Sequence, residues 1–188
     1  MEFIESDLKF VFDEKQWDVI TQFDSETDYK KVKDKLKGTK SIDFLGTTDD
    51  NIFFFEMKGF RGYQDQKSVK ERLADNAEDL TTEIAQKVRD TLACLLGGAR
   101  NSTNKSDIWQ KCCKIVTESN KRLIVIAWIE EDAPNEAVRK RLKIKNTVRR
   151  DKLAQKLSWL TKRIFIMNSG TEENIAGLSV SLMPAVNL

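Results

Sequence analysis

The pattern of apolar and polar residues is most distinctive in the segment that begins at Ser41 and reads SIDFLGTTDDNIFFFEMKGFRG. Its two β-rich parts, SIDFL and IFFFEMK, are separated by GTTDDN, which consists mainly of turn-forming residues. Two strand-forming runs joined by such a turn predict a hairpin of adjacent antiparallel strands. Both strands also carry charges, namely Asp43 in the first and Glu56 and Lys58 in the second. Charges are costly where water is excluded, so these three positions require an explanation.

The second strand of this hairpin alternates between two apolar faces. Side chains two residues apart in a strand point the same way, which places Glu56 and Lys58 together on one face. Phe53, Phe55 and Met57 then take the opposite face. Because both faces are apolar, the pattern indicates a central strand. The alternative is an edge hairpin in which Glu56 and Lys58 are the solvated end of a strand.

Periodicity and turn residues predict further elements along the chain. From Ser68 to Gly97, apolar residues recur every three or four positions and the pattern ends at a glycine pair, which predicts one long helix. A helix is expected over 106–119 with Ser106 as its N-cap, and another over 135–160 with a break near Asn146. The remaining expected elements are a helix over 24–38 and strands over 8–12, 122–130, 163–169 and 177–183.

This order of elements predicts an α/β fold in a single domain over residues 1–188. The segment 122–130 is continuously apolar, which is typical of a strand covered on both faces. We therefore expect a central mixed β-sheet flanked by helices on both faces. The acidic first residues and the lack of a long apolar run predict neither a signal peptide nor a membrane span, so we expect a soluble, cytoplasmic protein.

The composition limits the possible chemistry mainly through the absence of histidine. This absence excludes serine-histidine and cysteine-histidine triads, histidine-ligated zinc and histidine general bases. Any hydrolytic chemistry must therefore use carboxylates, lysines, hydroxyls or thiols.

The net charge of +2 conceals an uneven distribution of charge. Between Val138 and Arg163 many lysines and arginines are accompanied by a single acid, Asp151. Such a segment can follow a nucleic-acid backbone, whose phosphates bind lysine and arginine. A solvated amphipathic helix that packs its apolar residues on the sheet explains the same residues, and the two interpretations are compatible.

The charges of the hairpin suggest a metal site. The predicted pairing brings Asp43 beside Glu56, and two carboxylates that close need a cation between them. Carboxylate oxygens and water favour Mg²⁺ or Mn²⁺, which polarise a phosphoryl oxygen and lower the pKa of bound water. Lys58 is suited to orient the attacking water. These parts suffice for phosphodiester hydrolysis without histidine.

The same residues resemble the motif of the PD-(D/E)XK nuclease superfamily, which has the restriction-endonuclease-like fold. The match is Asp43 on one strand and Glu56, Met57 and Lys58 on the next, preceded by an acidic helix and followed by a long helix; Ile42 replaces the proline of the motif's name. The resemblance implies that Asp43 and Glu56 bind the metal ion and that Lys58 assists the water nucleophile.

Further site residues follow from this resemblance. Many members add an acidic residue from the first helix to the metal site, and of Asp24, Glu26 and Asp28 we favour Asp24. Many also place a polar or basic residue of the following helix near the site, for which Gln86 and Lys87 are the candidates, and we expect these two residues to bind the substrate.

Arg61 is a separate candidate for binding the substrate. It lies in the sequence GFRG directly after Lys58, where the glycines allow the backbone to approach a phosphate and Arg61 to contact it. An ordinary turn with an exposed arginine explains the same residues.

Together, these features predict a metal-dependent endonuclease that acts on nucleic acid, with DNA as the expected substrate. The enzyme is expected to act alone, as a homodimer or with a partner subunit. The first alternative is an inactive nuclease-like module that binds nucleic acid or a protein. The second is a structural or immunity-type partner in which Glu56 and Lys58 form only a charge pair.

Overall fold

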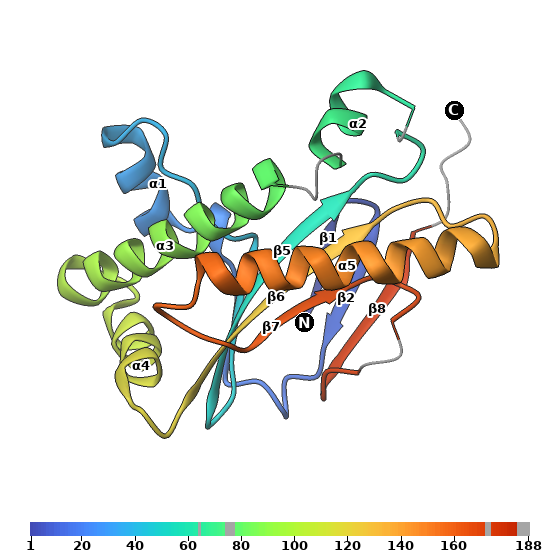
Figure 1. Cartoon of the computed structure of the whole chain (residues 1–188). Helices are drawn as coiled ribbons and strands as arrows, with labels where there is room; N and C mark the ends of the chain where they lie inside the picture. The colour runs from blue at the N-terminus through green and yellow to red at the C-terminus, as the bar shows by residue number, and fades with distance from the viewer. Residues whose placement is uncertain (64, 74–77, 172–173, 184–188) are drawn as a thin grey trace.

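The computed structural model of the chain describes residues 1–63, 65–73, 78–171 and 174–183. The elements, in chain order, are β1 (Glu2–Glu5), β2 (Leu8–Phe12), β3 (Val19–Gln22), the 3-10 helix η1 (Phe23–Ser25), α1 (Thr27–Lys35), β4 (Phe44–Thr47), β5 (Asn51–Gly59), α2 (Lys67–Leu73), α3 (Glu78–Asn101), α4 (Ser106–Thr117), β6 (Arg122–Glu130), α5 (Glu136–Lys156), β7 (Ile164–Met167) and β8 (Leu178–Leu182) (Figure 1). The expected mixed α/β class is confirmed.

A five-stranded mixed sheet forms the centre of the molecule, with the strand order β3-β4-β5-β6-β7. The predicted hairpin is present as β4 and β5, which pair antiparallel with Phe44 opposite Phe55. β5 also pairs parallel with β6, and β6 pairs parallel with β7. The interpretation of residues 52–58 as a central strand is therefore correct.

Helices α3, α4 and α5 pack on one face of this sheet (Figure 1). Their apolar side chains meet Ile52 and Phe54 of β5, as the periodic pattern of α3 and the alternation of β5 predicted. Ile84 and Val88 of α3 are completely buried in this layer.

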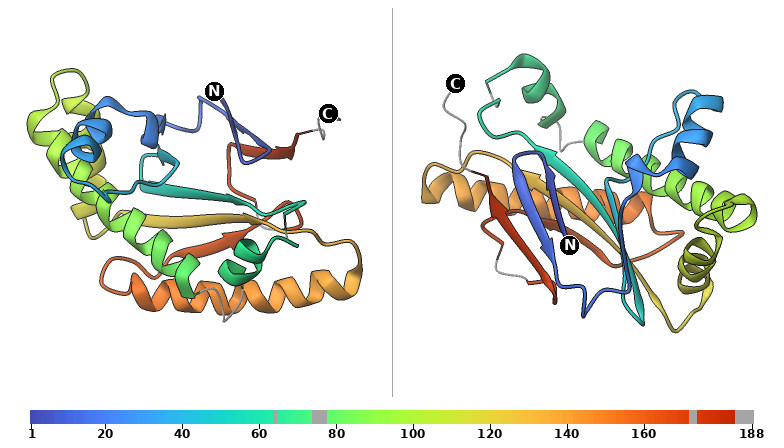
Figure 2. Two further views of the ribbon diagram at one scale, coloured as in Figure 1. Left: turned by 90° about the horizontal axis from the view of Figure 1, so that it is seen from above. Right: turned by 180° about the vertical axis from the view of Figure 1, so that it is seen from behind.

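Strands, not helices, cover the opposite face, so the expectation of helices on both faces was wrong. β1, β2 and β8 form a three-stranded antiparallel sheet that packs on this face (Figure 2). Phe53, Phe55 and Met57 of β5 meet Phe10 and Phe12 of β2 there. Alternating apolar side chains on two facing sheets interdigitate, so a second sheet covers this face in place of helices.

The helices differ from the predictions in several details. The single helix expected over 68–97 is described as two, α2 and α3, and residues 74–77 lie outside the described part. α3 continues through the glycine pair to Asn101; a Cβ on Gly98 would lie 2.6 Å from the Trp109 ring, so close packing accounts for that glycine. Lys105, not Ser106, occupies the N-cap position of α4, and its amide donates to Ser102 Oγ.

Helix α5 is continuous across Asn146, where a break was expected. The side chain of Asn135 caps its first turn by accepting a hydrogen bond from the Val138 amide. Asn146 accepts a hydrogen bond from Arg149 within the helix. Within the described residues, no helix combines the length and apolar character needed to cross a bilayer.

Candidate active site

Asp43 lies directly before β4 and is fixed by hydrogen bonds to both neighbouring segments. Its amide donates to the carbonyl of Phe55 at 3.0 Å, and its carbonyl accepts from the amide of Phe23 at 2.8 Å. Its Oδ2 accepts a hydrogen bond from the amide of Met57 at 2.6 Å. The hairpin thus brings the Asp43 carboxylate beside β5, as the sequence predicted.

Glu56 and Lys58 lie on the face of β5 that is covered by the helices. The Glu56 side chain is completely buried, and Lys58 Nζ lies 2.9 Å from its Oε1. Lys58 Nζ also donates to Glu83 Oε1 of α3 at 3.0 Å. The acid and the base predicted to share a face therefore form a direct ion pair.

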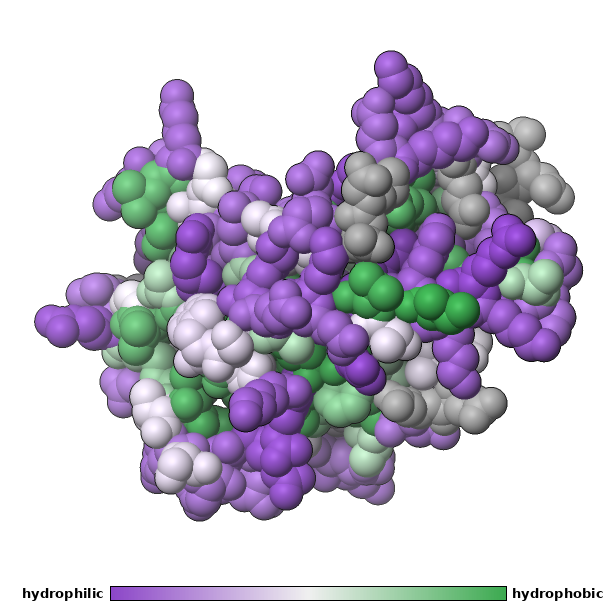
Figure 3. Space-filling view, in the orientation of Figure 1, coloured by the Kyte–Doolittle hydropathy of each residue, from purple (hydrophilic) through white to green (hydrophobic). Residues whose placement is uncertain are grey.

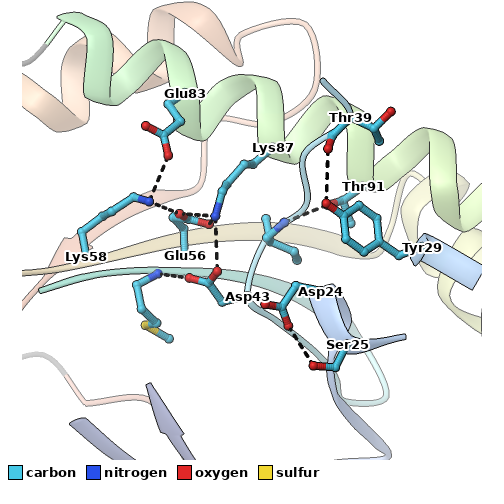
Figure 4. Close-up of polar contacts among 12 residues, drawn as sticks. Asp24, Ser25, Tyr29, Thr39, Asp43, Glu56, Lys58, Glu83, Lys87 and Thr91 are labelled. Carbon is cyan, nitrogen blue, oxygen red and sulfur yellow. Dashed lines mark hydrogen bonds and ion pairs between the residues drawn. The ribbon is translucent and has the colours of Figure 1, made fainter. Parts of the chain in front are cut away.

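Helix α3 contributes three polar residues at intervals of one helical turn, Glu83, Lys87 and Thr91, all facing the hairpin (Figure 4). Glu83 holds Lys58, and the Thr91 hydroxyl accepts a hydrogen bond from the Ile42 amide at 3.1 Å. Thr91 is buried on α3 together with the periodic apolar residues of that helix. Glu83 was not predicted, although its i, i+4 spacing from Lys87 is a signal that sequence alone contains.

Lys87 lies between the two carboxylates of the hairpin. Its Nζ is 3.3 Å from Asp43 Oδ1, 2.9 Å from Glu56 Oε2 and 2.7 Å from Glu56 Oε1 (Figure 4). The sequence predicted Lys87 near the site as a substrate-binding residue. The structure places its ammonium group in the position of a cation shared by the carboxylates.

These side chains form a continuous series of opposite charges. It runs from Arg72 of α2 to Glu83, then through Lys58, Glu56 and Lys87 to Asp43. Each buried carboxylate therefore has a cationic partner, which offsets the cost of removing it from water. This pairing explains how an apolar hairpin retains three charged residues.

The environment shifts the pKa values of this series. Burial raises the pKa of the Glu56 carboxyl to about 7, and the Asp43 carboxylate contributes to the rise, while Lys58 and Lys87 oppose it. Burial lowers the pKa of Lys87, but Glu56 and Asp43 outweigh it and the net shift is upward. Lys87 therefore remains a cation at neutral pH, while Glu56 titrates near neutrality.

Two more acidic side chains lie close to Asp43, namely Asp24 of η1 and Glu5 of β1. Burial and then the Asp43 carboxylate raise the pKa of each. In Figure 4 the Asp24 carboxyl lies beside that of Asp43. Asp24 was the favoured candidate of its helix, whereas Glu5 was not predicted because strand β1 was not.

The two other acidic candidates near Asp24 have different partners. Glu26 forms an ion pair with Lys105 at 2.6 Å, and Asp28 accepts a hydrogen bond from Trp109 Nε1 at 2.8 Å. Both residues thereby connect α1 to the start of α4 and not to the hairpin.

Arg61 and Gln86 lie outside this charged series. Arg61 is exposed in the turn after β5, and Gln86 is half-buried on α3 beside Lys87. Neither of them forms a hydrogen bond or ion pair with the described carboxylates. Their substrate contacts remain predictions.

Asp43 and Glu56 are the candidate ligands of a divalent cation. Among the described residues, no group of three or more acidic or cysteine side chains is placed to hold a metal ion. Glu56 Oε1 is buried and lies 2.9 Å from Lys58 Nζ and 2.7 Å from Lys87 Nζ, so two ammonium groups occupy the positions next to this oxygen. Asp43, Glu56 and water would suit Mg²⁺ or Mn²⁺, which prefer oxygen ligands and retain water, once the Lys87 ammonium moves aside.

Comparison with protein-family models, with curated proteins and with solved structures gives no significant match for this chain.

Proposed function

We propose that the protein is a metal-dependent nuclease with a restriction-endonuclease-like fold, and that it hydrolyses phosphodiester bonds, with DNA as its substrate. The observation that supports this proposal is the convergence of Asp43, Glu56 and Lys58 at one end of the central hairpin. The two carboxylates already share one cationic group, the Lys87 ammonium. A site that binds an ammonium with two carboxylates is also suited to a hard divalent cation.

In this proposal, Asp43 and Glu56 hold Mg²⁺ or Mn²⁺ through one or more of their oxygens. The bound ion supplies Lewis-acid activation of the phosphate and a lowered pKa for its water. Lys58, held at Glu56 and Glu83, orients the attacking water and opposes the charge that develops on the phosphate. The Met57 amide fixes the Asp43 carboxylate for this role.

Cleavage of supercoiled plasmid with Mg²⁺ or Mn²⁺ tests the proposal, with wild type beside Lys58→Met and Lys121→Met. Lys121 is a matched control because it forms an ion pair with Asp50 at the opposite end of β5. We expect Lys58→Met to lower the cleavage rate by about 10² to 10⁴-fold, the usual contribution of a positioned acid-base group. Lys121→Met should retain the wild-type rate.

The remaining outcomes are also informative. Equal cleavage by all three proteins would indicate a contaminating nuclease. Lys58→Met should remain folded, because Glu83 keeps Arg72 and Glu56 keeps Lys87 as partners. Thermal unfolding of each variant checks this point.

The position of Lys87 favours a second candidate function, an inactive nuclease-like module that binds nucleic acid or a protein partner. Its ammonium occupies the place between Asp43 and Glu56 that a metal ion would need. If Lys87 holds this place permanently, the carboxylates serve stability alone. Absence of cleavage by every variant, together with absence of Mn²⁺ binding to the wild type, would support this alternative.

A further inference from the structure

The two halves of helix α5 differ in how their positive charges are compensated. In the C-terminal half, Lys152 and Lys156 both form ion pairs with Glu78 at the start of α3. Arg149 is buried and forms an ion pair with Glu131. These cations connect α5 to the rest of the fold.

The N-terminal half contains what we call the basic segment, residues 139–145 of α5. Its cations are all exposed, and none forms an ion pair with a residue that the structure describes. They are Arg139, Lys140, Arg141, Lys143 and Lys145.

Local electrostatics disfavour this cluster in the isolated protein. Arg139 and Lys143 are four residues apart, as are Arg141 and Lys145, so like charges face each other on successive turns. Arg139 also lies in the first turn of α5, where the helix dipole disfavours positive charge. Only Glu136 supplies a negative charge in this half of the helix. Such uncompensated charge points to an anionic ligand.

The basic segment projects from the body of the molecule. In Figures 1 and 2 the N-terminal turns of α5 extend beyond the strands of the central sheet. The surface over these turns is largely hydrophilic in Figure 3. Ile144 is the large apolar residue exposed in α5, which is too little for insertion into a membrane surface.

The basic segment lies at the same end of the central sheet as the candidate active site. Lys58 and Gly59 pair with Ile129 and Glu130, the last residues of β6. α5 begins at Glu136, one short loop after β6. A ligand that reaches from the site past the end of β6 therefore approaches the basic segment.

We propose that the basic segment binds the phosphate backbone of a nucleic acid without regard to its sequence, and so holds the substrate at the Asp43 and Glu56 site. This inference rests on the proposed function, which makes a nucleic acid the substrate. The segment extends for about 9 Å at 1.5 Å per helical residue. A duplex presents one phosphate per about 1.7 Å of its axis, so about five phosphates lie within this length.

Fluorescence anisotropy with a labelled DNA duplex in EDTA tests the inference apart from cleavage. Lys140→Gln/Lys143→Gln removes two cations of the basic segment, and Lys152→Gln/Lys156→Gln removes two paired cations of the same helix. Lysine and glutamine have similar helix propensity, so helicity should be unchanged, as circular dichroism can verify. Both double variants change the net charge equally.

We expect the first double variant to bind the duplex about tenfold more weakly and to reduce the slope of log affinity against log salt by about two. The second should keep the wild-type slope and bind within about twofold. Unchanged binding in the first variant, or equal losses of affinity in both variants, would overturn the inference. Displacement of the duplex by polyglutamate of equal charge would also overturn it, and would favour an acidic protein partner.

Failure of the inference and failure of the proposed function give different results. Binding that depends on the basic segment, without cleavage in Mg²⁺ or Mn²⁺, supports the inference and contradicts the nuclease. Cleavage that depends on Lys58 but not on the basic segment supports the nuclease and overturns the inference.

Discussion

The two faces of β5 bury different kinds of side chain, although both belong to one strand. Toward the helices, Ile52 and Phe54 are followed by Glu56 and Lys58, which form ion pairs with α3. Toward the small sheet, the buried side chains are apolar and largely aromatic. The aromatic rings of this second layer are those of Phe3, Phe10, Phe12, Trp17, Phe44, Phe53, Phe55 and Trp128.

This difference separates stability from the proposed chemistry. The aromatic face is closely packed and largely apolar, and packing accounts for its stability. Its buried carboxylate, Glu130, accepts hydrogen bonds from Trp128 Nε1 and the Ser169 amide. The helix-covered face has the same apolar packing along most of β5 but ends in Glu56 and Lys58. A charged site at the end of a rigid, central strand is held in place by the layer behind it.

Among the substitutions that compare the two faces of β5, Phe55→Ala is expected to have the largest effect on stability. Phe55 is completely buried, and its ring centroid lies 5.8 Å from that of Phe12 and 6.0 Å from that of Trp17. We expect the free energy of unfolding to fall by about 3–5 kcal/mol, as for other buried aromatic residues replaced by alanine. Urea denaturation measures this change.

Phe165→Ala on β7 is the matched control for this substitution. Its side chain is 38% exposed, so the same replacement should cost only about 1 kcal/mol. Equal losses at the two positions would contradict the assignment of Phe55 to a closely packed layer that excludes water.

The second prediction uses the pH dependence of the free energy of unfolding to distinguish the two faces of β5. The pKa of Glu56 is raised from 4.5 to about 7 in the folded protein. The folded state then keeps a proton that the unfolded chain releases, so this residue makes stability fall as pH rises from about 4.5 to 7. The decline amounts to about 3 kcal/mol, at 1.36 kcal/mol per pKa unit.

Glu56→Gln cannot titrate, so the variant should lose most of this decline in metal-free buffer with EDTA. A smaller decline should remain, because the pKa values of Asp24 and Glu5 are raised as well. Phe55→Ala should keep the wild-type pH dependence, since it changes no titratable group. Denaturation series at pH 5, 6 and 7 measure all three proteins, and a wild-type slope in Glu56→Gln would exclude Glu56 as the titrating group.

Local sequence patterns predicted the hairpin and the charged part of the site well. Alternation in β5 determines which side chains share a face, and it correctly placed Glu56 with Lys58. Lys87 was expected near the site from the resemblance to the nuclease motif, and its Nζ lies 2.7 Å from Glu56 Oε1. The alternation of β5, by contrast, is a signal carried by residues close together in the chain.

The cover of the second face could not be predicted in the same way. β2 and β8 pair across most of the chain, with Leu8 opposite Leu182, and no local pattern encodes that pairing. Helices were expected on this face because β6 is continuously apolar. Such a run shows that both faces of a strand are covered, but it does not show whether helices or strands cover them. The same limit applies to Glu5, which reaches the site only through the small sheet.

The smallest expected effect concerns Lys87 and the helix-covered face alone. Its ammonium competes with a metal ion for Asp43 and Glu56, so Lys87→Met should bind Mn²⁺ more tightly than the wild type. We expect about a tenfold lower Kd, which corresponds to about 1.4 kcal/mol. Calorimetric titration of the metal-free proteins at pH 8, where Glu56 is ionised, measures the affinity.

A combined Lys87→Met and Asp43→Asn variant is the control for this measurement, because it removes the competitor and one ligand together. It should bind Mn²⁺ no more tightly than the wild type. Tighter Mn²⁺ binding by Lys87→Met, but not by the double variant, would mean that the Lys87 ammonium occupies the metal position and is displaced when a metal ion binds. Unchanged or weaker binding would mean that the ammonium is a permanent counter-ion, and the charges at the end of β5 would then stabilise the fold as the aromatic face does.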